Sequence, residues 1–241
     1  STSGGSALRL DADVLVLDGT ITVDGQTAST GGGAGGSVWV TTRMLQGTTS
    51  DGVIRARGGS GTYGYGSYGA YQHGSNGGGG GRIALYCDES THPYNFSGFA
   101  NVPLLQVNGG DDGYTTDRRG GSGTAYIECG SVNRTLVLDG NGHPRTTYLV
   151  DEGVTTYAFD HLHLYGSAKL GFTPANIADA TVTVQANFTT GDNTGELLIA
   201  STQHMVVPPR AGDVAFGFKV TTSTGSRLTA PASFTVCTTT I

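Results

Sequence analysis

A glycine run that breaks into an alternating apolar segment occurs three times in this chain, and it constrains the fold more than any other feature. Residues 31–40 read GGGAGGSVWV, residues 77–85 read GGGGGRIAL, and residues 120–127 read GGSGTAYI. The apolar segments begin at Ser37, Arg82 and Thr124, which are 45 and 42 residues apart. A recurrence at about 40 residues is typical of solenoids and propellers.

A second motif, an apolar–x–apolar segment that ends at glycine, alternates with the glycine runs. Its copies are TITVDG at residues 20–25, VIRARGG at 53–59 and LLQVNGG at 104–110. If equivalent strands lie over one another at about 4.8 Å, each motif contributes one inward apolar ladder, as a parallel β-helix requires. A propeller needs four antiparallel strands per repeat, and only about two strong ones are present.

We therefore expect an all-β chain that folds as a right-handed parallel β-helix with long Gly-rich loops. The expected organisation is a single domain over residues 1–241, with Gly-rich coils over 1–130 and less regular β coils or a cap over 131–241. Glycine would permit positive φ at the corners between sheets and close approach of neighbouring turns. The chain starts without an initiator Met or a signal peptide, and we expect it to be a piece of a longer precursor.

The loop between the first two glycine runs is rich in tyrosine and glycine. Three interpretations stay open: rings that lie on the wall of the solenoid, a sticky aromatic surface for sugars or another chain, or extended polyproline-II-like segments. The residues of possible surface contact are Tyr63, Tyr65, Tyr68 and Tyr71.

The order of motifs resembles the Gly-rich β-helix repeats of large secreted proteins of marine invertebrates and protists. The resemblance covers roughly residues 10–200, and it rests on GGGGGRIALY at 77–86, YNFSG at 94–98, GGSGTAYI at 120–127, RTLVLD at 134–139 and FDHLHL at 159–164. It implies a right-handed parallel β-helix in an extracellular multidomain protein. That family has no known catalytic set, so the resemblance assigns no catalytic residue here.

Cysteine positions follow the register of the glycine-run motif. Cys87 lies five residues after Arg82, and Cys129 lies five residues after Thr124. Stacked strands about 4.8 Å apart fall within the Cα range of a disulfide, so we predict a Cys87–Cys129 bond; two buried free thiols are the alternative. Cys237 is left without a partner.

Composition and charge exclude several classes of partner. A formal net charge of −6 with only 13 Lys and Arg makes nucleic acid an unsuitable partner, and no apolar run is long enough to span a membrane. Three Asn-x-Ser/Thr sequons indicate a secreted glycoprotein. The predicted glycosylation sites are Asn95, Asn133 and Asn187, the last on the outward face of an alternating segment.

No residue pattern defines a catalytic, cofactor or metal site. His161 and His163 share one strand face and could bind a metal together, but Leu162 and Leu164 are the better inward pair, so we expect both histidines to face solvent. His143 is expected to lie in a plain turn. Asp111, Asp112 and the segment 117–119 (DRR) are expected to form a solvated turn with local ion pairs.

These observations predict a non-catalytic extracellular structural or adhesive scaffold module that self-associates or contacts matrix or glycan. The alternative is a carbohydrate-binding or polysaccharide-cleaving β-helix similar to pectate lyases. An outer groove lined by carboxylates and an Arg would favour the enzyme, whereas smooth, uncharged faces would favour the scaffold.

Overall fold

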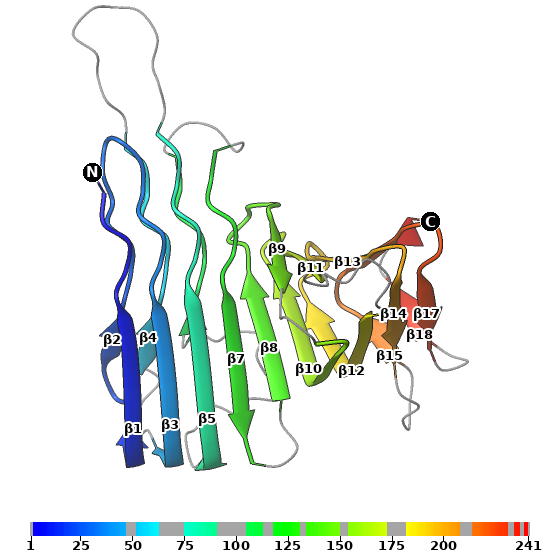
Figure 1. Cartoon of the computed structure of the whole chain (residues 1–241), viewed down its shortest axis with the longest axis horizontal. Helices are drawn as coiled ribbons and strands as arrows, with labels where there is room; N and C mark the ends of the chain where they lie inside the picture. Colours follow the sequence, from blue (N-terminus) through cyan, green and yellow to red (C-terminus); the bar gives the residue numbers. More distant parts are fainter. Residues whose placement is uncertain are drawn as a thin grey trace, which may run out of the picture.

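The structure is a computed structural model that describes most of the chain. The described residues are 2–46, 52–62, 75–90, 105–112, 118–130, 134–149, 154–172, 182–207, 214–230, 234–236 and 239–240. They form nineteen strands and no helix (Figure 1). This part of the chain contains no long apolar helix of the kind that crosses a membrane. The strands divide among four sheets.

The largest sheet has nine strands and runs the length of the molecule (Figure 1). Its strands, in spatial order, are β1 (Ala7–Val16), β3 (Ser37–Gln46), β5 (Arg82–Ser90), β7 (Thr124–Cys129), β8 (Arg134–Asp139), β10 (Thr156–Tyr165), β12 (Val182–Gly191), β14 (Gln203–Val206) and β17 (Arg227–Thr229). Neighbouring strands are parallel except β7 and β8, which are antiparallel.

Three smaller sheets accompany it. The three-stranded sheet contains β2 (Thr20–Thr22), β4 (Val53–Arg55) and β6 (Leu105–Gln106). The five-stranded sheet contains β9 (Thr146–Leu149), β11 (Lys169–Phe172), β13 (Glu196–Ile199), β16 (Lys219–Thr222) and β19 (Thr239–Thr240). The two-stranded sheet pairs β15 (Val214–Phe216) with β18 (Phe234–Val236). Their pairs are all parallel.

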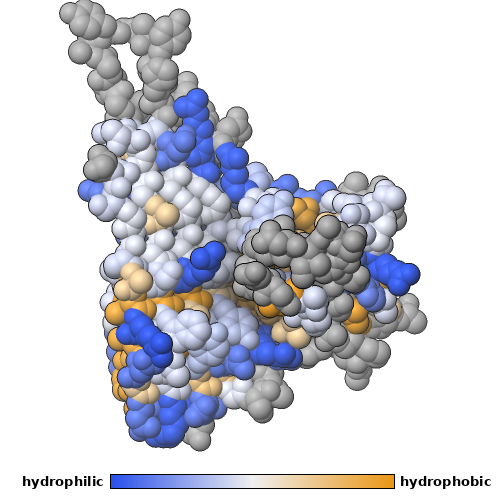
Figure 2. Space-filling view, in the orientation of Figure 1, coloured by the Kyte–Doolittle hydropathy of each residue, from blue (hydrophilic) through white to orange (hydrophobic). Residues whose placement is uncertain are grey.

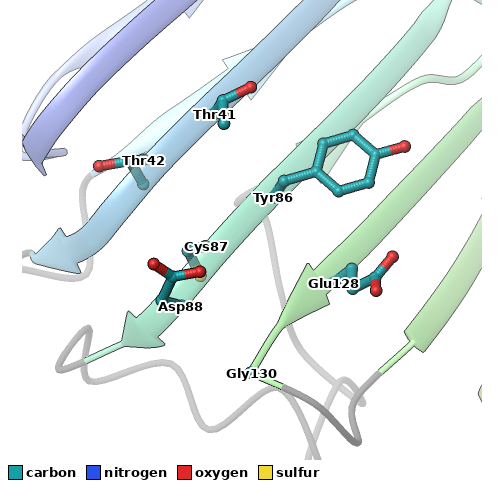
Figure 3. A pocket seen from close by; sticks show the side chains of 7 residues that line it. All are labelled: Thr41, Thr42, Tyr86, Cys87, Asp88, Glu128 and Gly130. Carbon is teal, nitrogen blue, oxygen red and sulfur yellow. The ribbon is translucent and has the colours of Figure 1, made fainter.

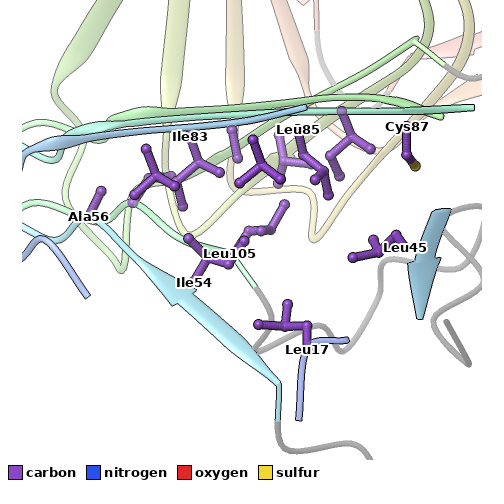
Figure 4. Packing of buried hydrophobic residues seen from close by; sticks show 14 of the residues in the cluster. Leu17, Leu45, Ile54, Ala56, Ile83, Leu85, Cys87 and Leu105 are labelled. Atoms are coloured by element: carbon purple, nitrogen blue, oxygen red, sulfur yellow. The ribbon is translucent and has the colours of Figure 1, made fainter. Parts of the chain in front are cut away.

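The register predicted from the glycine runs is confirmed in the first half of the large sheet. Ser37 pairs with Arg82, and Arg82 pairs with Thr124. The inward residues of β3, β5 and β7 are at most 2% exposed: Val38, Val40, Ile83, Leu85, Ala125 and Ile127. They pack against the three-stranded sheet, whose buried residues include Ile54 and Leu105 (Figure 4). We call this cluster the first core.

The glycine runs form neither strands nor corners. They lie side by side in extended segments that are joined by backbone hydrogen bonds. In one such chain of bonds Gly59 donates to Gly33 (2.8 Å), Gly78 to Gly59 (2.9 Å), Gly110 to Gly78 (2.8 Å) and Gly120 to Gly110 (2.9 Å). Within the described parts of the three runs only Gly31 has a positive φ, of 133°. Close approach of backbones, rather than corner geometry, therefore explains the glycine. We call this region the glycine bundle.

A second core lies on the opposite face of the same nine-stranded sheet. Directly paired residues of antiparallel strands point to one face. Ala125 pairs with Val137, which joins the first core, whereas Tyr126 pairs with Leu136, which joins the second. The second core continues along β10 through Leu162 and then to the five-stranded sheet. The sheet is thus packed on one face in its first half and on the other face in its second half.

The prediction of a right-handed parallel β-helix is wrong. The described strands form separate sheets, mixed or parallel, and none closes or winds as a solenoid. Two physical reasons account for the difference. The chain turns back after Cys129, so strand direction and the buried face both change between β7 and β8. The glycine runs satisfy their backbone groups by bonding to one another and to the second motif instead of turning the corners of a coil.

Candidate functional site

Three aromatic side chains lie on neighbouring strands of the nine-stranded sheet, on the face opposite the first core. Trp39 of β3 and Tyr126 of β7 both pair with Ala84 of β5, and Tyr86 lies two residues further along β5. Because the side chain of Ala84 is only a methyl group, the Tyr86 ring can lie between the rings of Trp39 and Tyr126. The Trp39 and Tyr86 ring centroids are 4.9 Å apart, and those of Tyr86 and Tyr126 are 5.9 Å apart. We call these three residues the aromatic row.

Hydrogen bonds hold the outer rings of the row. Trp39 Nε1 donates to Thr41 Oγ1 at 3.1 Å, and the Tyr126 hydroxyl donates to Glu128 Oε2 at 2.9 Å. Trp39 is 45% exposed, and the two tyrosines are half-buried. Tyr126 packs against the second core, which anchors one end of the row. The polar edges of the two outer rings are satisfied within the protein, and the rings pack on one another, so what the row presents to a ligand is mainly apolar ring surface, most of it on Trp39.

An open hollow of about 430 Å³ lies beside the row (Figure 3). It is lined by Thr41, Thr42, Tyr86, Cys87, Asp88, Glu128 and Gly130. Tyr86 extends from β5 toward β7, where Glu128 lies (Figure 3). The hollow therefore offers one aromatic face, two carboxylates and a threonine hydroxyl to whatever enters it.

The electrostatics of the hollow are acidic. Burial and the Glu128 carboxylate raise the pKa of the Tyr86 hydroxyl, and burial with the Glu128 hydrogen bond raises that of Tyr126 further. Both hydroxyls are therefore neutral donors. Asp88 has no ion pair among the described residues. Arg9 pairs with Asp11 at 2.9 Å, Arg43 with Asp13 at 2.7 Å, and Arg134, which lies opposite Glu128 on β8, with Asp160 at 3.1 Å. Arg82, two residues before Ala84 on β5, has no ion pair among the described residues.

The disulfide lies directly under this face. Cys87 and Cys129 occupy paired positions of β5 and β7, with Cα atoms 4.4 Å apart, and are bonded. Both side chains are buried at the edge of the first core, and Cys87 also lines the hollow. The bond connects the two strands that present Tyr86, Tyr126 and Glu128.

Most of the other predicted contact and modification sites lie outside the described residues. This holds for the four tyrosines of the Tyr/Gly loop (Tyr63, Tyr65, Tyr68 and Tyr71), for Asn95 and Asn133, and for Cys237. Asn187 lies on β12, whose side chains are not described before Gly191. These sites stay predictions. Within the described ranges, no group of three His, Cys, Asp or Glu side chains could hold a metal ion.

The expectation that both histidines of β10 face solvent is wrong for His163, which is 1% exposed. Val137 pairs with His163, so the change of buried face at β8 brings the histidine onto the first-core side of the sheet. The His163 ring is nearly parallel to the rings of His161 and Tyr165. The ring centroids are 5.9 Å apart for His161 and 6.1 Å apart for Tyr165. Burial and the neighbouring His161 lower the pKa of His163 to about 4.

The buried histidine predicts acid sensitivity. Its folded pKa of about 4 lies below the ordinary value of 6.5, so between these values the unfolded chain binds the proton and the native state does not. The free energy of unfolding should fall by about 3 kcal/mol as the pH drops from 6.5 to 4, and the contribution should be constant above 6.5. Urea unfolding across this range should show a flatter profile for His163→Phe. Equal slopes for both proteins would contradict the assignment.

The acidic turn is less exposed than expected. Asp111 pairs with Arg119 at 3.4 Å, as the sequence predicts, but it also contacts His143 Nε2 at 3.1 Å. His143 and Asp112 are both 1% exposed, so neither lies in a simple solvated turn. The segment borders the glycine bundle, and the carbonyl of Asp111 accepts a hydrogen bond from the amide of Gly61.

The aromatic row was missed in the sequence, although a signal for it exists. In each copy of the glycine-run motif, an aromatic residue occupies an outward position two or four residues after the start of the strand: Trp39, Tyr86 and Tyr126. Alternation predicts their common face, but not that Ala84 leaves room for Tyr86 between the other two rings.

Comparison of the chain with protein-family models, with curated proteins and with solved structures finds no match. The resemblance to secreted Gly-rich proteins therefore stays a prediction, and the function is argued from the geometry of the aromatic face.

Proposed function

We propose that this protein is a non-catalytic, extracellular adhesive module that binds neutral polysaccharide along the aromatic row. The observation that carries the proposal is the row of Trp39, which is exposed, and the half-buried Tyr86 and Tyr126, with centroids 4.9 and 5.9 Å apart across three strands. Sugar rings present polarised C–H groups, which stack on the electron-rich faces of aromatic rings. A row across several strands suits an extended chain of sugars better than a small, enclosed ligand.

The polar groups beside the row favour neutral over acidic sugars. Asp88 and Glu128 accept hydrogen bonds from sugar hydroxyls, and the Tyr86 hydroxyl donates one. The same two carboxylates repel a polymer of uronic acids, and the chain as a whole carries a net charge of −6. The ligand class is thus neutral polysaccharide, in contrast to the acidic substrates of pectate-lyase-like proteins.

An extracellular location is supported by the disulfide. Bonds of this kind persist in oxidising compartments and are rare in the cytosol. The Cys87–Cys129 bond stiffens the two strands that display most of the row, which lowers the entropy lost when a ligand binds.

Replacing Trp39 by alanine should weaken polysaccharide binding by roughly fivefold or more, because truncation of an aromatic anchor typically costs more than about 1 kcal/mol. Affinity gel electrophoresis with soluble β-glucan, mannan and polygalacturonate measures this directly. We expect retardation of the wild type by at least one neutral polymer and not by polygalacturonate. Tyr86→Ala should have a similar effect.

Val16→Ala provides the control, because this side chain is 54% exposed but belongs to the last residue of β1, seven residues beyond Arg9, which pairs with Trp39. It should bind as the wild type does. A wild-type protein that neutral polymers do not retard, or a Trp39→Ala variant with unchanged retardation, would refute the proposal. Release of reducing ends from any of the polymers would instead indicate an enzyme.

A further inference from the structure

Strand β1 ends the nine-stranded sheet, and its outer edge has no partner strand among the described residues. It is ten residues long and contains no proline, and its charged residues Arg9, Asp11 and Asp13 are of both signs, so they can pair across a two-fold contact. We propose that this edge pairs with the same strand of a second copy of the chain, antiparallel and centred on Leu10, to form a two-fold dimer. This goes beyond the proposed ligand binding and does not depend on it.

The first core is uncovered on this side. Leu8 and Leu10 are half-buried, whereas Val38 and Val40, their partners on β3, are at most 2% exposed. Leu15 and Ile21 also pack at the margin of this core without being buried. Hydrophobic surface gathers along this edge (Figure 2, lower left). Val38 and Val40 are buried because β3 has a neighbouring strand on each side. A strand added at the free edge of β1 would bury Leu8 and Leu10 in the same way.

Hydrogen-bond direction restricts which residues of a second strand can face β1. The amide of Ser37 donates to the carbonyl of Ser6, and Ala7 pairs with Ser37. In a parallel pair the backbone groups of alternate residues point to the same neighbour. Even-numbered residues at the start of β1 therefore bond to β3, while Ala7, Arg9 and Asp11 direct their backbone groups to the free edge.

Charge selects the register. Arg9 pairs with Asp11 of its own copy at 2.9 Å, and an antiparallel strand centred on Leu10 adds Asp11 of the other copy opposite Arg9. This contact occurs twice, at backbone hydrogen-bonded positions. Centring on Asp11 would instead oppose two Asp11 carboxylates, and centring on Arg9 would oppose two guanidinium groups. A parallel, in-register pair would oppose like charges at Arg9, Asp11 and Asp13. Opposite charges across a strand pair stabilise it and like charges destabilise it, so the Leu10-centred arrangement is favoured.

The two edge strands of the nine-stranded sheet, β1 and β17, also favour a closed two-fold dimer over head-to-tail assembly, in which β1 of one copy would pair with β17 of the next. The opposite edge strand, β17, has only three residues (Arg227–Thr229), too few to match the ten of β1. An isologous contact uses the same long strand twice and closes at two copies.

Charge variants test the register. Asp11→Arg opposes Arg9 of the other copy, and the dimer dissociation constant should rise by at least about tenfold. The combined variant Arg9→Asp/Asp11→Arg exchanges the charges and should restore the wild-type constant. Sedimentation of the whole chain from roughly 1 to 100 µM measures the constant. A monomeric wild type over this range overturns the proposal, and so does a single variant that dimerises like the wild type.

A cross-link tests the geometry independently of affinity. Leu10 lies on the two-fold axis as a non-hydrogen-bonded pair, in which Cα atoms are about 4.5 Å apart and a disulfide can form. In a Cys237→Ser background, Leu10→Cys should yield a covalent dimer under oxidation, while Leu8→Cys, opposite Ala12, should not. Equal cross-linking of both variants, or of neither, overturns the register.

Discussion

Replacing Gly80 by alanine is expected to lower the free energy of unfolding by at least about 3 kcal/mol, because a methyl group has no space there. A Cβ at this position would overlap the carbonyl oxygen of Val107 and the amide nitrogen of Gly123. Both belong to the hydrogen bond that Gly123 donates to Val107 across the glycine bundle. Backbone atoms cannot rotate aside as a side chain can, so neighbouring segments would have to separate. Urea unfolding measures the change.

The neighbouring residue supplies the matched control. A Cβ on Gly79 would have no heavy atom within 4 Å, and its φ is not in the left-handed region. Gly79→Ala should therefore change stability by no more than about 1 kcal/mol, and it can stabilise the protein by restricting the unfolded chain. Equal effects at the two positions would mean that the glycine bundle does not hold the backbones in contact.

Loss of the Cys87–Cys129 disulfide is expected to cost about 4 kcal/mol, since the bond closes a loop of more than 40 residues in the unfolded chain. The double variant Cys87→Ala/Cys129→Ala should show this loss in urea unfolding without reductant. The same loss should appear in the wild type when reductant is added. The double variant should be insensitive to reductant.

The loop closed by this bond includes residues 91–104 and 113–117, which lie outside the described residues. The estimate depends on loop length and not on their conformation. Cys237→Ser is the control and should unfold like the wild type. A double variant as stable as the wild type would show that the bond adds nothing to the strand pairing around it.

Predictions from the sequence succeeded where the argument needed only local alternation and a repeated spacing. The pairing of Ser37 with Arg82 and Thr124 follows from the copies of one motif, and the position of the two cysteines follows from that register. Inward positions of β3, β5 and β7 follow from period two. The outward aromatic positions are equally local, so the aromatic row was within reach of the same reasoning.

Predictions failed where contacts depend on segments distant in the chain. His163 and Leu162 have the same local pattern whichever face is buried, and only the reversal between β7 and β8 decides which of them faces which core. The reversal follows the segment 130–133 (GSVN), whose glycine is compatible with a hairpin but equally with the Gly-rich loops expected elsewhere in the chain. Similarly, nothing in the segment 77–81 distinguishes corner glycines from bundled ones, because both conformations are open to glycine.

Local sequence patterns were enough to predict β3, β5 and β7, their register, their inward side chains and the pairing of Cys87 with Cys129, but not β1, which is one ten-residue strand paired with β3. Contacts between distant segments set the rest: the sheet has a core on each face, the glycine runs bond to one another and to the second motif, and Ala84 leaves room for the Tyr86 ring between Trp39 and Tyr126. The physical reason is that side-chain alternation is encoded locally, residue by residue. Backbone hydrogen bonds between distant glycines, and the direction in which a strand returns, depend on which segments meet in space.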